Sequence, residues 1–402
     1  MTTKSKVPQI RFKGFSGEWE ENIINNLGDI VTGSTPKTQD KSNYCGEYLF
    51  VSPADIQNNR YVESTITTLS LKGHNLGRIL EKNSVLFVSI GSTIGKVAQI
   101  KNKATTNQQI NAINPNKYND SNFIYSMLVN KSERIKKLAS AQAVPIINKT
   151  SFSEIEILIP HIAEQIKIGN YFQQLDKLLE QKEKKYQKLK QFKKAMLDKM
   201  FPKNGADTPE IRFKGFSGKW EEGILGEVTD VYDGTHQTPN YTVSGVMFLS
   251  VENIKTLYSE KYISEEAFEK EFKIFPKKND VLMTRIGDIG TANVVETDTP
   301  KAYYVSLALL KYKGLNPYFL KTSIFSETVK KDLWHRTLHI AFPKKINKNE
   351  IAKIKVYYPA SENEQEKIGN YFQKLDTQID LQQKELEKLK NIKKASLSKM
   401  FV

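Results

Sequence analysis

The sequence lacks the residues on which several classes of protein depend. Of its 402 residues only one, Cys45, is a cysteine and five are histidines, which excludes a disulfide framework and a cysteine zinc site. No apolar run is long enough to span a bilayer, and the first dozen residues contain no apolar signal segment. We therefore expect a soluble, cytoplasmic protein that does not contact a membrane.

Motifs for catalysis are incomplete as well. Residues 91–97, GSTIGKV, are one residue short of a phosphate-binding loop, and Val97 replaces the hydroxyl residue that would bind magnesium. Residues 316–319, NPYF, lack the second proline of the adenine methyltransferase signature, and no glycine-rich cofactor loop accompanies them. His335 and His339 are four residues apart but lack the glutamate of a zinc-protease helix. These gaps predict a chain without a catalytic or metal site.

Positive charge is in clear excess, with 60 Lys and Arg against 45 Asp and Glu, which gives a formal net charge of +15. More than half of the excess lies outside two lysine-rich segments, 164–201 and 364–401. A basic surface spread over globular parts favours binding to a phosphate backbone. A purely solubilising excess, or a membrane-surface stripe on the lysine-rich segments, remains an alternative.

The two lysine-rich segments are copies of one long sequence. They share 22 of 38 aligned positions and both begin EQ-x-KIGNYF. Their apolar residues recur in steps of three and four, which predicts a long helix with a coiled-coil seam. The seam residues that we expect to pair or to bind partners are Ile168, Phe172, Leu175, Leu179 and Leu189 in the first copy, with Ile368, Phe372, Leu375, Ile379 and Leu389 in the second.

The matching registers favour pairing between the two helices, although two amphipathic helices on separate cores remain an alternative. A compact domain usually has its termini close together, so the domain between the helices should bring the end of the first to the start of the second. We therefore expect an antiparallel pair. At about 1.5 Å per residue each helix would be roughly 57 Å long, with a globular body at either end of a rod.

A second repeat opens each half, PQIRFKGFSGEWEE from Pro8 and PEIRFKGFSGKWEE from Pro209. Short β-branched and aromatic runs bounded by Gly, Asn and Pro come after it, with helices expected at 121–138 and 316–333, so the fold class is α+β. The expected domains are 1–163, the anchor and first globular domain; 164–201, the first helix; 202–208, a linker; 209–363, the second anchor and domain; and 364–402, the second helix. The result is an internal repeat with pseudo-twofold symmetry.

Two unlike domains, each followed by a nearly identical EQ-x-KIGNYF helix, resemble the specificity subunit of Type I restriction-modification systems. The shared GSTP and DGTHQTP segments and the VL-x-x-x-IG turns at 85–91 and 281–287 add to the resemblance. It implies two target recognition domains that each read half of a bipartite site in double-stranded DNA, and helices that set the gap and bind two modification subunits. Those subunits would carry S-adenosylmethionine and methylate adenine, restriction subunits would use ATP and Mg, and this chain would carry no cofactor.

Candidate DNA-reading residues are those of Arg, Lys, amide or hydroxyl type where the halves share a framework but differ in side chain. They are Ser34, Thr35, Lys37, Ser89, Lys96, Asn107, Gln108 and Gln109 in the first half, and Thr235, His236, Gln237, Thr238 and Arg285 in the second. A surface arginine and a polar edge strand are the structural alternatives. At the level of the whole chain, the alternatives are a divergent methyltransferase or nuclease, and a coiled-coil protein that binds DNA or bridges partners without a dedicated methyltransferase.

Overall fold

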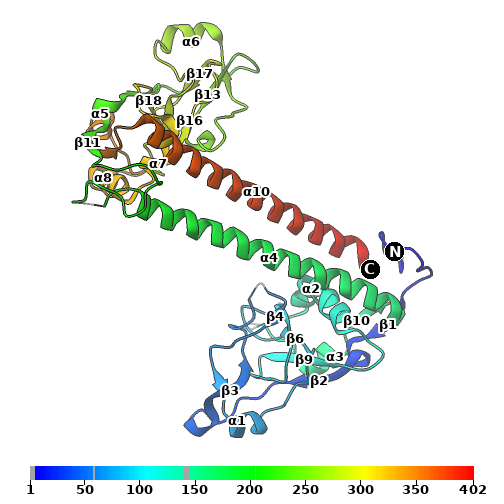
Figure 1. Cartoon of the computed structure of the whole chain (residues 1–402). Coiled ribbons are helices and arrows are strands. Elements are labelled where there is room, and N and C mark those ends of the chain that lie inside the picture. Colours follow the sequence, from blue (N-terminus) through cyan, green and yellow to red (C-terminus); the bar gives the residue numbers. More distant parts are fainter. Residues whose placement is uncertain (1–4, 58, 140–144, 204) are drawn as a thin grey trace. The chain divides into compact units, whose positions relative to one another are not determined.

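The computed structural model describes residues 5–57, 59–139, 145–203 and 205–402 (Figure 1). The chain divides into two compact units, and each contains one globular domain with parts of both long helices. The first unit comprises Met1–Lys184 and Gln383–Val402, and the second comprises Lys185–Gln382. Residue 204 of the expected linker lies outside the described residues.

The domain of the first unit is built on three small sheets. β1 (Glu20–Ile23) pairs with β10 (Glu156–Ile159), so the strand at the end of the anchor meets the strand that closes the domain. The five-stranded sheet has the order β2 (Gly28–Thr32), β9 (Ile110–Pro115), β6 (Val85–Val88), β7 (Val97–Ile100), β4 (Tyr61–Val62). The three-stranded sheet has the order β5 (Thr68–Leu69), β3 (Tyr44–Val51), β8 (Thr105–Thr106). Its helices are α1 (Leu71–Leu76), α2 (Ser121–Leu138) and α3 (Lys149–Ser153), with 3-10 turns η1 (Ile24–Leu27) and η2 (Lys41–Asn43).

The second unit repeats this plan with different side chains. β11 (Glu221–Ile224) pairs with β19 (Lys355–Tyr358). One sheet has the order β12 (Asp230–Asp233), β18 (Leu307–Lys311), β15 (Val281–Thr284), β16 (Ala292–Val294), and the other has β14 (Tyr262–Ile263), β13 (Val246–Leu249), β17 (Lys301–Tyr303). Its helices are α5 (Leu225–Val228), α6 (Glu265–Glu271), α7 (Pro317–Ile324), α8 (Glu327–Arg336) and α9 (Lys348–Ala352), with the 3-10 turn η3 (Val251–Asn253). The α+β class and the repeat are confirmed.

The prediction of a single helix over 316–333 was wrong. The segment 316–333 forms two helices, because α7 ends with Phe325 as its C-cap and α8 begins with Ser326 as its N-cap. The Ser326 hydroxyl accepts a hydrogen bond from the Val329 amide, which is the usual role of a serine before the first turn of a helix. The expectation for 121–138 is confirmed, since α2 has those bounds and Asp120 caps it.

The two long helices are α4 (Ile162–Met200) and α10 (Glu362–Met400). Within the first unit they are antiparallel, because the residue numbers of contacting pairs rise along one helix and fall along the other. The Tyr171 hydroxyl lies 3.0 Å from Ser396 Oγ, and Lys182 pairs with Glu385. Within the second unit Lys193 pairs with Asp376 in the same sense. The antiparallel coiled coil is confirmed.

The glutamate and glutamine that open the EQ-x-KIGNYF motif bind each helix to its own domain. Arg11 of the first anchor donates two hydrogen bonds of 2.7 Å to the buried Glu164 carboxylate, and Arg212 does the same to Glu364 at 2.6 and 2.7 Å. Gln165 accepts from the Asp120 amide and donates to the Pro160 carbonyl. Gln365 repeats the arrangement with the amide of Asn316 and the carbonyl of Pro359. A buried carboxylate is tolerated here because a planar guanidinium satisfies both of its oxygens.

The glycine of the same motif allows a close approach. A Cβ on Gly169 would lie 2.2 Å from Asp120 Oδ1, and one on Gly369 would lie 2.8 Å from the Phe319 amide nitrogen. The start of each long helix therefore packs directly against the first turn of α2 or α7. Any larger residue at these positions would push the helix off its domain.

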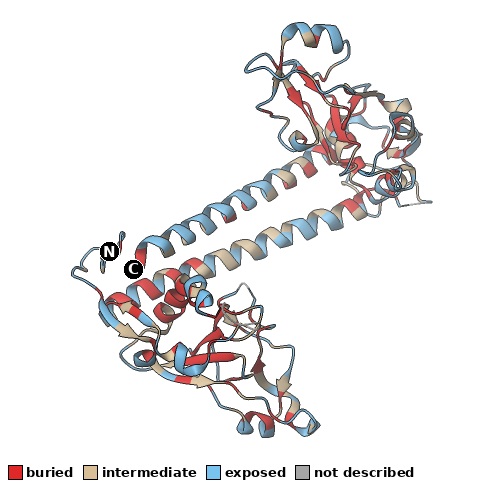
Figure 2. Ribbon diagram, turned by 180° about the vertical axis from the view of Figure 1, so that it is seen from behind, coloured by how far each residue is buried: buried red, intermediate tan, exposed pale blue. Residues whose placement is uncertain are grey.

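Each unit is completed by the end of the helix that begins in the other unit. Phe401, after α10, packs in the first unit against Trp19, Phe123 and Phe172, with ring centroids 5.5–6.0 Å away. Phe201, after α4, packs in the second unit against the rings of Trp220, Phe319 and Phe372. Figure 2 shows buried residues concentrated at the ends of both helices.

This packing refines the role of the expected seam. Ile168, Phe172, Ile368 and Phe372 are buried in the domain cores together with the end of the opposite helix, so they do more than pair two helices. Leu175 and Leu375 are also buried. The remaining four, Leu179, Leu189, Ile379 and Leu389, are only half-buried, in keeping with a weaker seam towards the middle of the helices.

We expect Phe401→Ala to destabilise the first unit by about 3–5 kcal/mol, because a buried phenylalanine is lost from an aromatic cluster and leaves a cavity. Hydrogen exchange should speed up in α2 of that unit. Phe201→Ala should do the same to α7 of the second unit. Phe192→Ala, at a half-exposed ring, is the control and should leave both exchange patterns unchanged. The interpretation fails if Phe401→Ala is as mild as this control.

Candidate DNA-reading surfaces

In the first domain, the loop after β2 and the segment before β9 lie side by side. The amide of Ser34 donates to the carbonyl of Thr106 at 2.9 Å, and the Thr35 hydroxyl donates to Gln108 Oε1 at 2.6 Å. A Cβ on Gly33 would lie 2.1 Å from the Asn107 carbonyl oxygen, so glycine is needed for the two segments to meet.

The expected reading residues of these two segments therefore form one polar surface. Asn107 Nδ2 donates to Gln109 Oε1 at 3.0 Å, which orients two neighbouring amides. Thr35, Lys37 and Gln108 are exposed, and the other members are partly exposed. Side chains of this type, held on a braced loop, can donate to and accept from base edges.

Two other expected contacts in this domain have structural partners. Ser89 is 2% exposed and its hydroxyl accepts from Asn111 Nδ2 at 2.9 Å, so it supports the surface from below and is not available to DNA. This corrects the expectation for Ser89, which rested on its place next to the exposed turn. The Lys96 ammonium donates to the carbonyl of Ile56 at 2.8 Å and braces the neighbouring loop.

The second domain places its loop on the same framework. The amide of Thr235 donates to the carbonyl of Tyr303 at 3.1 Å, and the amide of Val305 donates to the carbonyl of Thr235 at 2.9 Å. The loop then exposes its next three side chains, His236, Gln237 and Thr238. In the strand segment beneath, Tyr304 and Val305 take the places of Asn107 and Gln108 of the first domain, so one scaffold carries different side chains in the two domains.

Arg285 is not on this surface. Its side chain is 6% exposed, its Nη1 pairs with Asp233, and its Nε donates to the Ile346 carbonyl at 2.9 Å. The guanidinium thus ties β15 to the end of β12 and to the segment before α9. The expectation of a base or phosphate contact by Arg285 is corrected, because a contact with DNA would require these buried bonds to break.

Two exposed features beside the expected loops have no recognisable signal in the sequence. In the second domain, Leu338 and Lys345 bridge a projecting turn next to Gly287, and Ile340 and Phe342 on this turn are fully exposed. No periodic pattern marks such a turn in the sequence. In the first domain, the exposed Arg78 donates to the carbonyl of Thr32 at 2.8 Å, directly before the polar loop, and no repeat pointed to it.

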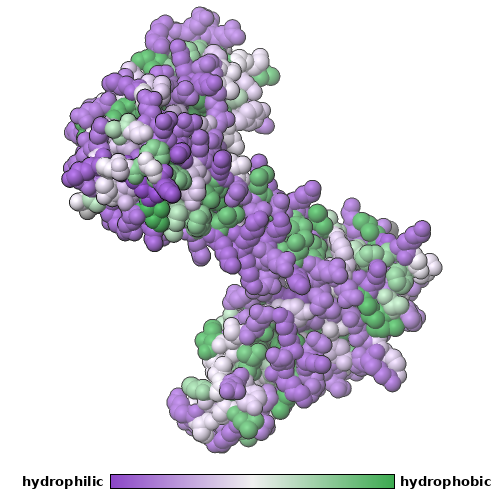
Figure 3. Space-filling model, viewed as in Figure 1, coloured by the Kyte–Doolittle hydropathy of each residue, from purple (hydrophilic) through white to green (hydrophobic). Residues whose placement is uncertain are grey.

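Among the residues that the structure describes, no group of three or more His, Cys, Asp or Glu side chains could hold a metal ion. His339 Nε2 lies 2.8 Å from the Trp334 carbonyl oxygen. No described helix is both long enough and apolar enough to cross a membrane. Hydrophilic side chains cover most of the face shown in Figure 3.

We expect Arg285→Ala to destabilise the second domain by about 3–5 kcal/mol, because it leaves the Asp233 carboxylate without its buried partner. Urea denaturation followed by tryptophan fluorescence measures the loss. Lys313→Ala, which removes an exposed pair with Asp230 in the same domain, is the control and should cost less than about 1 kcal/mol. A folded Arg285→Ala variant of unchanged stability would restore Arg285 as a candidate DNA contact.

Comparison with known proteins agrees with this architecture. The family model of the Type I restriction modification DNA specificity domain matches twice, at residues 16–191 and 217–391. The MjaVIII specificity subunit of Methanocaldococcus jannaschii is 23% identical over 94% of this chain and 90% of its own length. The HindI specificity subunit of Haemophilus influenzae is 32% identical over 35% of this chain and 32% of its own.

Solved structures give the same fold. The crystal structure of a Type I restriction-modification S subunit from M. genitalium covers 98% of this chain and 99% of its own, with a TM-score of 0.69 and 18% identity. The two matched segments span most of the chain and coincide with its internal repeat. The chain therefore belongs to the family of Type I restriction-modification specificity subunits.

Proposed function

We propose that this specificity subunit reads a bipartite site in double-stranded DNA, one half with each recognition domain. The observation that carries the proposal is the shared framework on which the two domains present different loops. In each domain the loop after a glycine lies against the equivalent strand segment. The first domain exposes Gln108 there, and the second exposes the loop side chains His236 and Gln237. Two readers of this kind have the same docking geometry and different base preferences.

The charge of the chain supports a phosphate partner. The formal net charge is +15, and basic side chains are spread over the globular parts as well as the helices. Phosphate contacts of this kind supply affinity and position, while loops supply sequence preference. In the second domain the exposed turn that carries Ile340 and Phe342 is followed by the exposed Lys344 and Lys345, and we therefore include it among the candidate DNA contacts.

The proposed partners are two modification subunits, with restriction subunits added to the complex. Two apolar side chains support a binding surface that occurs twice: Phe192 and Ile392 occupy equivalent positions of the repeat and are 45% and 39% exposed. An apolar side chain that is exposed at the same position of both copies is a candidate contact for a partner that binds twice. A repeated surface suits two copies of one partner.

Catalysis in this proposal belongs to the partners. The modification subunits would bind S-adenosylmethionine and methylate adenine, and the restriction subunits would use ATP and Mg. The chain has no complete cofactor motif. The segment most similar to a phosphate-binding loop, residues 91–97, forms the turn between β6 and β7. The specificity subunit therefore contributes recognition and assembly.

Exchange of one domain tests the two-reader proposal. Residues 22–161 are replaced by the matching segment of another family member with a known site, and bound sequences are selected from random DNA in the presence of modification subunits. We expect one half-site to change and the other to stay, because each domain presents its own loops on the shared framework. The matched control replaces 223–361 and should change the other half-site. A simultaneous change of both half-sites in either exchange would rule out separate readers.

Charge placed on the repeated apolar surface tests the partner proposal. We expect Phe192→Lys and Ile392→Lys each to remove one modification subunit, and the double variant to remove both, because a buried lysine costs an interface about 2 kcal/mol or more. Native mass spectrometry counts the subunits. Leu178→Lys is the control: this side chain is also exposed, but the second helix carries Gln378 in its place. Retention of two subunits by both single variants would place the surface elsewhere.

A further inference from the structure

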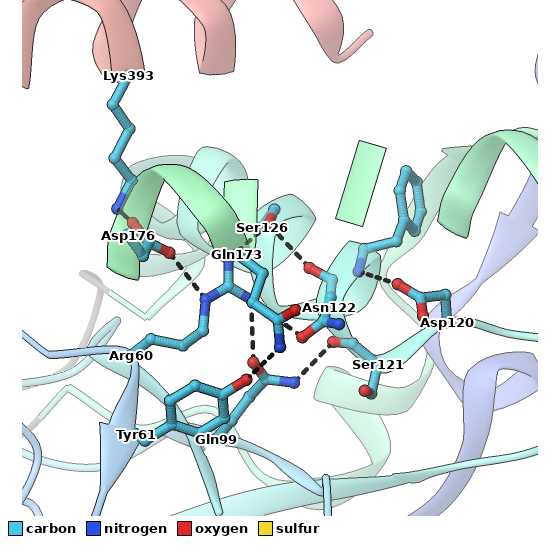
Figure 4. A network of polar contacts seen from close by, with 11 residues as sticks. Arg60, Tyr61, Gln99, Asp120, Ser121, Asn122, Ser126, Gln173, Asp176 and Lys393 are labelled. Atoms are coloured by element: carbon cyan, nitrogen blue, oxygen red, sulfur yellow. Dashed lines mark hydrogen bonds and ion pairs between the residues drawn. The ribbon is translucent and has the colours of Figure 1, made fainter. Parts of the chain in front are cut away.

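Asp176 of α4 is the centre of a polar network that joins three parts of the first unit (Figure 4). Its Oδ2 accepts from Arg60 Nε at 2.8 Å, and Arg60 belongs to the recognition domain, next to β4. Its Oδ1 lies 2.6 Å from the ammonium of Lys393 on α10. One carboxylate thus contacts the domain and both helices.

Arg60 is held on every side. Its Nη1 donates to Gln99 Oε1 at 2.9 Å, its Nη2 lies 3.3 Å from Ser126 Oγ, and its guanidinium carbon lies 4.0 Å above the ring of Tyr125. Its side chain is almost completely buried. A planar, buried guanidinium with partners on Nε, Nη1 and Nη2 allows little rotation, so its single Nε bond to Asp176 Oδ2 has a fixed direction.

The second unit has an equivalent network around an aspartate of the long helix, but a lysine takes the role of the arginine. Asp376, the repeat equivalent of Asp176, pairs with Lys193 of α4 and lies 3.9 Å from the ammonium of Lys321 on α7. Burial lowers the pKa of Lys321, and the Asp376 carboxylate acts against that shift, so the pair holds a charge in a poorly solvated place.

The cationic residues that the two domains supply, Arg60 and Lys321, do not occupy equivalent positions in the repeat. Alignment of Ile56 with Ile254 puts Tyr258, which is exposed, at the place of Arg60, while Lys321 arises from the helix that corresponds to α2. Both halves therefore keep an aspartate at the same helix position and a cation from the domain, although unrelated elements supply the cation. An aspartate that only filled space at this helix position would not need a cationic partner from the domain in both halves.

We propose that Asp176 is a positioning residue that fixes the orientation of the first recognition domain on its helices, and so sets how strictly the protein selects the gap between half-sites. This inference rests on the proposed two-reader function. Arg60 holds Asp176 through one hydrogen bond of 2.8 Å from a guanidinium that is itself fixed, whereas the Lys321 ammonium lies 3.9 Å from Asp376. The first network therefore contributes more to the choice of gap than the second.

The experiment selects bound sequences from DNA libraries in which the gap varies by single base pairs, with the complete complex of specificity and modification subunits. We expect Asp176→Asn to keep the bases of both half-sites and to reduce the preference for the native gap over its neighbours by about tenfold, the usual scale of coupling in one salt-bridge network. Asp376→Asn should reduce it less. Glu63→Gln, which removes an exposed pair with Lys101 in the same unit, is the matched control and should change nothing.

Lys393→Gln covers the case in which Asp176→Asn does not fold, because it leaves the buried bond between Asp176 and Arg60 in place. It should also broaden the gap preference, by a smaller factor. An unchanged gap preference in folded Asp176→Asn, or in Lys393→Gln where the first does not fold, overturns the inference. Loss of base preference in the unaltered complex would instead refute the proposed function, so the two failures can be told apart.

Discussion

Each recognition domain depends on a helix end that belongs to the other half of the chain. Phe401 fills the first core and Phe201 fills the second, each among three aromatic rings. The first domain therefore closes its core with a residue from the far end of the sequence, and the second closes its core with the residue that follows the helix of the first half. This exchange of ends explains why the helix had to be duplicated whole, from the EQ motif to the terminal Met-Phe, because both ends are parts of a domain core.

Repeated and periodic features of the molecule could be predicted from the sequence. The α+β class, the antiparallel helices and the internal symmetry were accessible because 22 of 38 positions of the helix recur and its apolar residues keep heptad spacing. The bounds of α2 were also accessible, since Asp120 lies directly before the helical pattern. The break between α7 and α8 was not, because Ser326 lies in a continuous helical pattern and its capping role emerges only in three dimensions.

The reading surface was predictable only in part. The loops at Ser34 and Thr235 come after glycines that the two halves share, and the structure puts each beside a strand segment, at Thr106 in the first domain and at Tyr303 in the second. The choice of Ser89 and Arg285 failed for a common reason: a polar side chain at a strand end looks the same in sequence whether it faces solvent or a buried partner such as Asp233. Burial depends on distant segments, here the one before α9, which no local pattern reveals.

The division of labour between helix and domain also explains how two halves with so little in common stay compatible with one scaffold. The helix keeps the acceptors, Glu164 for the anchor and Asp176 for the domain, at fixed positions in both copies. The domain needs only to deliver a cation to that acceptor, and Arg60 and Lys321 do so from different elements. A requirement for charge and reach, rather than for a particular residue, leaves the remaining domain surface free to diverge. Sequence preference can then change without loss of the fit between domain and helices.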